Sequence, residues 1–267
     1  MDLVQLEEAV YEEHDLFTPP DNPDGRIWRY LDFAKYVSLL EHQALFFATV
    51  EALDDPFEGT VPVRDLDVRP ILEAMRDTVT DEEVALARAN IVDTVKLARS
   101  FWCVSCWHQN DYESAAMWSV YASQGQGIAI VSSFNRLTQS FNYPQPIFVG
   151  MVQYIDYDNE SIEGGYTNVF APLLMKRRSF EHEKELRAVV GGALEDVRED
   201  LPVGQIQNIK VAKYGVQVPI DLNSLIEKVY VAPRAQPWYR ELVEQVSQRY
   251  GLNVPIIQSD LAHDPML

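Results

Sequence analysis

The stretch RIWRYLDFAKYVSLLEHQALFFATV, residues 26–50, predicts a strand, a helix and a second strand in succession. RIWRYL is rich in aromatic and branched residues that favour strands. Asp32 is a good N-cap residue, and the apolar residues of 33–40 then recur at i, i+3, i+4 and i+7, as on one face of a helix. ALFFATV, from Ala44, reads as a buried strand. We therefore expect the folded body to begin at Arg26.

Helices and strands alternate irregularly through the rest of the chain. A helical region over 68–99 should break near 77–80, where Thr80 and Glu83 have the spacing of a capping box. FWCVSCW and GIAIVSS predict strands on either side of a helix that Asp111 would cap. The later strand candidates follow one another with few helices between them: IFVGMVQYIDY, ELRAVVGG, IKVAKYGVQVPI, KVYVA and VPIIQS. This order favours an α+β fold with a mixed, largely antiparallel sheet flanked by helices.

A last helix begins at Pro237, a residue tolerated in a first helical turn. Its spacing predicts that Trp238, Leu242 and Val246 share one face of this helix and that Gly251 ends it. We expect residues 1–25 to form an N-terminal extension and linker, since they end in TPPDNPDG, and residues 26–267 to form a single domain.

Composition narrows the classes of function. The chain has 267 residues, with 22 Lys and Arg against 41 Asp and Glu, for a formal net charge of −19. Such an acidic chain is poorly suited to binding duplex nucleic acid or an anionic membrane through bulk electrostatics, although a small-molecule or nucleotide ligand can still bind at a local cation. The first residues lack a signal-peptide pattern and no long apolar window occurs, so we expect a cytoplasmic protein without membrane contact.

The two cysteines, Cys103 and Cys106, lie close to His108. A structural zinc site takes four ligands, and no second CxxC or HxxxH is present to supply the others. On a strand the two thiols would also point to opposite faces. We therefore expect both cysteines to be structural and no metal to bind them.

Carboxylates cluster at two places. Asp54, Asp55 and Glu58 follow an apolar strand in the loop DDPFEG. In FEHEKELRAVV, Glu181, Glu183 and Glu185 alternate in sequence, as they would along one face of a strand.

Arg187 continues that face, and like charges at this spacing need a cation or a ligand to compensate them. One interpretation is an ion-paired edge strand, and the other is a functional carboxylate pair. Arg29, between Trp28 and Tyr30, has the same two interpretations: a structural arginine stacked on aromatic rings, or a clamp for a phosphate or carboxylate.

Several blocks resemble the bacterial and phage domain-of-unknown-function 2971 family. They are WRYLDFAKYVSLLEHQALFFATVEALDDPFEG, SFWCVSCWHQNDYESAAMWSVYASQGQGIAI, KRRSFEHEKELRAVV and LIEKVYVAPRAQPWYRELVEQV. The likeness extends from about Ile27 to Asp260, and the family name carries no activity.

The order of chemical groups also resembles ADP-ribosyltransferase-like folds, which use NAD. The resemblance implies that Arg29 holds a diphosphate oxygen and that Tyr30 or Tyr121 stacks on nicotinamide. It implies that Glu183 or Glu185 bonds the ribose 2′-hydroxyl and favours the cation-like transition state that loses nicotinamide.

We expect these blocks to converge on one cleft, with the loop carrying Asp55 and Glu58 and with Trp118 and Arg187 contributing to binding. Two other functions stay open. One is a metal-assisted phosphoester hydrolase or nuclease that uses the carboxylates, and the other is a non-catalytic binding module of a defence or toxin system.

Overall fold

The fold is built around a nine-stranded sheet. The structure is a computed structural model, and it describes residues 11–76, 78–121, 126–162, 168–192, 194–195, 210–211 and 214–262. The strands of this sheet are β1 (Arg26–Asp32), β2 (Ala44–Thr49), β3 (Trp102–Gln109), β4 (Gly127–Ser133), β5 (Ile147–Met151), β8 (Glu185–Gly191), β11 (Gly215–Pro219), β12 (Lys228–Val231) and β13 (Ile256–Gln258). All of its pairs are antiparallel except β12 with β13. The mixed, largely antiparallel α+β architecture expected from the sequence is thus confirmed.

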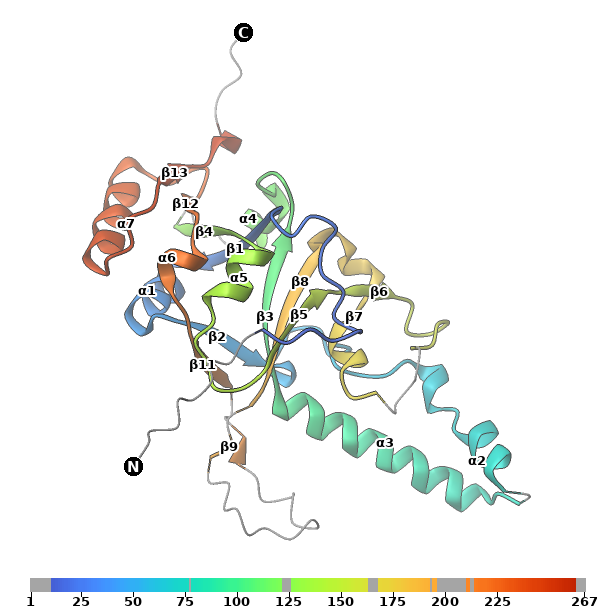
Figure 1. The fold of residues 1–267 in the computed structure, drawn as a ribbon. Coiled ribbons are helices and arrows are strands. Elements are labelled where there is room, and N and C mark those ends of the chain that lie inside the picture. Colours follow the sequence, from blue (N-terminus) through green and yellow to red (C-terminus); the bar gives the residue numbers. More distant parts are fainter. Residues whose placement is uncertain are drawn as a thin grey trace, which may run out of the picture.

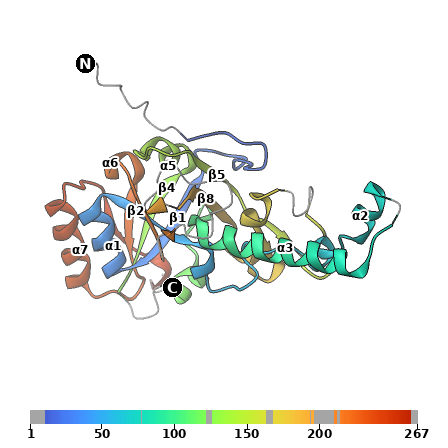
Figure 2. The ribbon, with the colours of Figure 1, turned by 90° about the horizontal axis from the view of Figure 1, so that it is seen from below.

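Helices flank this sheet (Figures 1 and 2). They are α1 (Phe33–His42), α2 (Arg69–Met75), α3 (Asp81–Phe101), α4 (Ala115–Tyr121), α5 (Phe134–Ser140), α6 (Leu222–Leu225) and α7 (Pro237–Arg249). Two short pairs lie outside the main sheet, β6 (Gln153–Ile155) with β7 (Met175–Arg177) and β9 (Leu194–Glu195) with β10 (Lys210–Val211). No described helix is both long enough and apolar enough to cross a membrane.

The predicted helix starts are mostly confirmed. The Asp32 carboxylate accepts the Lys35 main-chain N–H at 2.7 Å and so caps α1. Thr80 and Glu83 form the capping box of α3, the long helix that projects from the body with α2 near its far end (Figure 2). Asp111 is not a cap, because α4 begins at Ala115 and Ser114 Oγ accepts the Met117 N–H instead. The predicted helix end at Gly125 lies outside the described residues.

The buried face of α7 is one residue away from the face that carries Trp238, Leu242 and Val246. Tyr239 and Val243 are buried, whereas Trp238 is 55% exposed. The reason is that α7 packs against α1: the rings of Phe33 and Tyr239 lie 5.8 Å apart, and Ser247 Oγ is 2.7 Å from the Tyr36 hydroxyl. Docking thus rotates the buried stripe of α7 by one residue.

The described part of the N-terminal segment also contacts the sheet. Phe17 is 2% exposed and lies 5.3 Å from the Phe148 ring, and the Glu12 N–H donates to the Ile147 carbonyl. The division of the chain at residue 26 stays a prediction.

The sheet splits beside β3, and this split positions the site. Strand β8 pairs with β3 from Trp102 to His108, so it occupies one whole edge of β3. Strands β2 and β1 must share the other edge. β2 pairs there only at 103–104 and β1 only at 108–109. Residues 105–107 of β3 therefore face a gap between β1 and β2.

Candidate functional site

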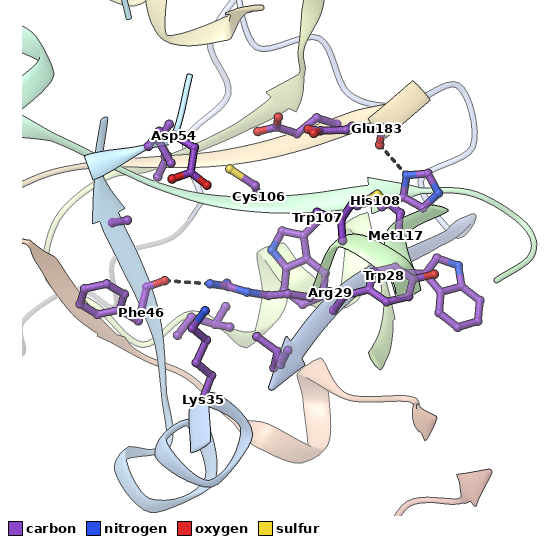
Figure 3. Close-up of a pocket in the computed structure, with 18 of the residues that line it drawn as sticks. Trp28, Arg29, Lys35, Phe46, Asp54, Cys106, Trp107, His108, Met117 and Glu183 are labelled. Atoms are coloured by element: carbon purple, nitrogen blue, oxygen red, sulfur yellow. Dashed lines mark hydrogen bonds between the residues drawn. The ribbon is translucent and has the colours of Figure 1, made fainter. Parts of the chain in front are cut away.

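A cavity of about 650 Å³ opens at this gap (Figure 3). Its walls come from β1, α1, β2, the loop after β2, β3, α4 and the segment that leads into β8. Cavities of this size hold small ligands and cofactors, which are commonly bound by an apolar wall and a few placed polar groups. The lining here combines the aromatic rings of Trp28, Trp107 and Phe180 with charged side chains of both signs.

Arg29 spans the gap from β1. One terminal nitrogen donates to the Phe46 carbonyl on β2 at 2.9 Å, the other donates to Ser105 Oγ on β3, and the guanidinium lies 5.8 Å from the Trp107 ring centre. These partners are neutral, and no ion pair among the described residues includes Arg29. Burial lowers the pKa of Arg29 to about 10, so it stays charged at neutral pH. A fixed arginine without a carboxylate partner is suited to binding an anion.

The opposite wall carries a connected set of ion pairs, which we call the Lys176 network. Lys176 Nζ lies 2.6 Å from Glu183, 2.9 Å from Glu185 and 3.2 Å from Glu58. Arg187 completes the network with contacts of 2.6 Å to both Glu58 and Glu185. Arg187 is fully buried, so the network forms a charged floor beneath this side of the cavity.

The ion pairs of the Lys176 network keep Glu185 and Lys176 charged although both are buried. Burial alone would raise the pKa of Glu185, but Arg187 and Lys176 outweigh it and bring the pKa down to about 2. Burial likewise disfavours the charged form of Lys176, but Glu185 and Glu58 raise its pKa above the ordinary lysine value. A buried charge is tolerated only when it is paired in this way.

The predicted ladder of three glutamates on one strand face is wrong. Residues Arg178–Glu183 form a 3₁₀ helix, Lys184 adopts a left-handed conformation with φ of 41°, and β8 begins only at Glu185. The turn leaves Glu181 exposed and brings Glu183 and Glu185 to the same cation from different directions. Alternation in the sequence does not reveal a change in chain direction.

The structure distinguishes the two candidate carboxylates. The Glu185 side chain is 3% exposed and bonds both Lys176 and Arg187. The Glu183 side chain is 15% exposed, and Lys176 is its one ion-pair partner among the described residues. Both line the cavity, but Glu183 has the carboxylate more open to a ligand.

Of the other site residues expected from the sequence, some line the cavity and others are buried behind its wall. Tyr30, Asp55 and Glu58 line the cavity. The Tyr30 hydroxyl accepts the Ser114 N–H, and Asp55 pairs with Arg177 at 2.9 Å.

Trp118 is 4% exposed and lies behind Tyr30, with the two rings 5.0 Å apart. It does not line the cavity, and neither does Arg187. The side chain of Tyr121 lies outside the described residues.

Among the lining residues that the sequence analysis did not propose for the site are Trp107, His108 and Phe180. Trp107 and His108 are adjacent on β3, so their side chains point to opposite faces of the sheet and alternation alone does not group them. Only the pairing of β3 with β1 and β2 shows which part of β3 faces the gap. His108 lies directly between Trp28 and Glu185 in the strand register.

Cys103 and Cys106 point to opposite faces of β3, as expected: the first packs in the core beneath α1, and the second lies on the other face and lines the cavity. Burial raises the pKa of the Cys106 thiol, which disfavours a reactive thiolate. Among the described residues, no three His, Cys, Asp or Glu side chains are placed to hold a metal ion. The amino and guanidinium groups of the Lys176 network already occupy the positions between its carboxylates. These contacts weigh against the metal-assisted hydrolase.

Comparisons with known proteins give a distant likeness. No family model matches the sequence, and no curated protein matches it significantly, so the resemblance to the domain-of-unknown-function 2971 family stays a prediction. Among solved structures, the chain is similar to Thermus sp. 2.9 DarT in complex with NAD+, with a TM-score of 0.40 and 10% identity over 92% of this chain and 100% of that chain. The same DarT in complex with ADP-ribosylated ssDNA gives a TM-score of 0.38 and 11% identity, over 91% of this chain and 96% of that chain. At such low similarity, the function has to be argued from the cavity.

Proposed function

We propose that this protein binds NAD+ in the cavity and transfers its ADP-ribose group to an acceptor. The observation that carries the proposal is the separation of charge in one cavity. Arg29 offers an anion site that has no carboxylate partner among the described residues. The other wall holds Glu183, which Figure 3 labels, together with Lys176, Glu185 and Glu58. NAD+ has the matching form, with a negative diphosphate in the middle and a cationic nicotinamide ring at one end.

Arg29 would hold the diphosphate. Its guanidinium is fixed from two sides by Ser105 and Phe46, so little side-chain freedom is lost on binding. Lys35 also lines this part of the cavity and adds a second positive charge at its mouth, although Asp32 lies 3.5 Å from its ammonium group.

The acidic wall would receive the nicotinamide riboside. This wall carries five carboxylates: Asp54, Asp55, Glu58, Glu183 and Glu185. Three cations pair with them, Lys176, Arg177 and Arg187, so two negative charges remain in excess. This excess of negative charge favours a cationic ring. The ring of Tyr30 supplies an apolar wall nearby.

Glu183 is the carboxylate that we assign to the chemistry. Breaking the bond between ribose C1′ and the nicotinamide nitrogen sends the bonding electron pair to nicotinamide and leaves positive charge on the ribose. A fixed carboxylate that accepts a hydrogen bond from the 2′-hydroxyl stabilises that charge as it develops. An acceptor oxygen or nitrogen then bonds to C1′ and releases its proton to solvent.

Release of nicotinamide from NAD+ tests the proposal. We expect wild-type protein to release nicotinamide when incubated with NAD+ and cell extract, which supplies the acceptor. Glu183→Gln should lose turnover by about 100-fold or more, the usual size for removing one transition-state partner. Glu181→Gln is the matched control, because Glu181 belongs to the same short helix and is exposed.

Two results would count against the proposal. Folded wild-type protein that releases no nicotinamide, with or without extract, would contradict transfer. Binding of NAD+ without its consumption would support the non-catalytic binding module instead.

A further inference from the structure

Phe46 and Gln217 form a pair of exposed side chains in the cavity wall. Phe46 lies on β2 and is 42% exposed, although its neighbour Phe47 is fully buried and packs on Phe141. Gln217 lies on β11 and is exposed as well. Both Phe46 and Gln217 line the cavity. A single exposed phenylalanine is ordinary, so the groups around it decide what it can bind.

The strand register places these two side chains together. Phe46 is opposite Gln217 in the antiparallel pair of β2 with β11, so both side chains project from the same face of the sheet. The Phe46 carbonyl points away from β11, because it accepts a hydrogen bond from Arg29 across the gap. Phe46 and Gln217 are therefore a non-hydrogen-bonded pair, the kind whose side chains lie closest to each other.

Small residues surround this pair. Ala44 and Ala48 project from the same face of β2 as Phe46, and they line the cavity too. Gly215 lies beneath the end of the ring, because a Cβ atom on this glycine would be 2.8 Å from Phe46 Cζ. The glycine thus lets the ring lie across β11, and the two alanines leave space beside the ring for a second flat group.

The pair offers two kinds of contact to a ligand. The ring of Phe46 provides a face on which a planar base can stack. The Gln217 amide has an oxygen that accepts and a nitrogen that donates, which match the 6-amino group and N7 of adenine. The described residues supply no hydrogen-bond partner to this amide. A purine with a 6-amino group would satisfy both of its ends.

The position of the pair fits the anion site at Arg29. The Phe46 carbonyl lies 2.9 Å from a terminal nitrogen of Arg29, whereas the Phe46 ring points away from that arginine (Figure 3). In the same view Arg29 lies between Phe46 and Glu183. A dinucleotide with its diphosphate on Arg29 would therefore direct its adenosine toward Phe46 and its nicotinamide riboside toward Glu183.

We propose that Phe46 and Gln217 form the adenine subsite of the cavity: Phe46 stacks on the base, and Gln217 binds its 6-amino group and N7. This inference rests on the proposed function and adds the residues that select the base. Both are specificity-determining residues, because they lie away from the bond that breaks. The subsite distinguishes adenine from hypoxanthine, which has an oxygen at position 6 and cannot donate a hydrogen bond there.

Calorimetric titration with hydrolysis-resistant carbocyclic NAD+, ADP and IDP tests the subsite. ADP and IDP share the diphosphate and differ only in the base, so wild type should bind ADP about three- to tenfold more tightly, the size of one hydrogen bond. Phe46→Leu removes the ring but keeps the carbonyl that bonds Arg29, so all three ligands should bind about tenfold more weakly. Phe46→Tyr keeps an aromatic face and should bind them as wild type does.

Gln217→Met isolates the amide. Methionine has a similar length but cannot form the two hydrogen bonds, so the ratio of ADP to IDP affinity should fall to about one. Gln153→Met is the matched control, because Gln153 is exposed on β6 and lies outside the cavity. Melting temperature is recorded for each variant to confirm the fold.

Three results would overturn the adenine subsite. The first is wild type that binds ADP and IDP equally well. The second is folded Phe46→Leu that binds carbocyclic NAD+ as tightly as wild type. The third is folded Gln217→Met that keeps the wild-type preference for ADP.

The failure of this inference and of the proposed function differ. If wild-type protein binds carbocyclic NAD+ and folded Phe46→Leu and Gln217→Met bind it equally well, only the adenine subsite is lost. If folded wild-type protein does not bind carbocyclic NAD+ at all, the proposed function fails and the adenine subsite fails with it.

Discussion

Arg29 and Arg187 are both strand arginines near the same cavity, yet their surroundings are opposite. Arg187 is fully buried and lies 2.6 Å from each of two carboxylates, Glu58 and Glu185. Among the described residues, Arg29 bonds only the neutral oxygens of Ser105 and Phe46. An arginine whose charge is already balanced contributes to the fold, whereas one whose charge is unbalanced in a cavity is available to a ligand. The predictions below test this distinction.

The largest expected effect is on stability, at Arg187. Arg187→Met removes one of the two cations that contact Glu58 and Glu185 and leaves three carboxylates to share Lys176 alone among the described residues. Breaking a buried ion pair in this way typically destabilises by about 3–5 kcal/mol. For a chain of this size the melting temperature should fall on the order of 10 °C. Arg29→Met should lower it much less, since only hydrogen bonds to neutral oxygens are lost. Equal losses in the two variants would show that the arginines do not differ in the way described.

The second expected effect is on turnover, and it distinguishes the catalytic role assigned to Glu183 from the structural role of Glu185. Glu185→Gln removes a charge that Lys176 and Arg187 both contact, so it should destabilise the fold. Glu183→Gln leaves Lys176 with Glu58 and Glu185 and should retain most of the stability while losing about 100-fold in turnover. Rates of nicotinamide release at a temperature well below both melting points measure this split. A larger stability loss in Glu183→Gln than in Glu185→Gln would reverse the assignment.

The third effect is the acid sensitivity of the Lys176 network. The pKa of Glu185 is lowered to about 2 in the folded state, from an ordinary value of 4.5. The unfolded chain therefore binds this proton first, and the stabilisation by Glu185 is complete above pH 4.5 and is lost as the pH falls toward 2. Denaturant unfolding between pH 6 and pH 3 should show this decline. Glu185→Gln should be less stable at pH 6 and should have a flatter profile, and an unchanged slope in this variant would contradict the account.

The smallest effect lies on the projecting helix, away from both arginines. Thr80→Ala removes the N-cap of α3 and should destabilise by about 1 kcal/mol. Because Thr80 does not line the cavity, NAD+ affinity should be unchanged. This variant shows whether a modest loss of stability by itself weakens binding. If it does, the binding defects of the cavity variants need a correction for stability.

Local signals in the sequence predicted much of the fold. The cap at Asp32, the capping box at Thr80 and the strand around Arg29 depend on neighbouring residues, and the structure confirms them. The apolar spacing of α7 does not identify its most buried face, because the docking of α7 on α1 decides which side is buried.

The candidate site was harder to predict from the sequence than the helices and strands, because its shape depends on which distant strands pair. Arg29, Glu183 and Glu185 could be chosen from their residue types and local patterns. The gap beside β3 could not, because it results from β1 and β2 sharing one edge of that strand. For the same reason no local pattern indicated that His108 lies between Trp28 and Glu185, or that Glu183 turns toward Lys176.

Calorimetric titration of NAD+ into wild-type protein and Arg29→Met tests the central claim most directly. Arg26→Met is the matched control, since Arg26 lies on the same strand but is exposed and lies outside the cavity. The account predicts saturable binding to wild type, similar binding to Arg26→Met, and a loss of about 10- to 100-fold in Arg29→Met, the size of a hydrogen bond to a charged group. Equal affinity in folded Arg29→Met and wild type would contradict the account, and so would the absence of NAD+ binding to folded wild-type protein.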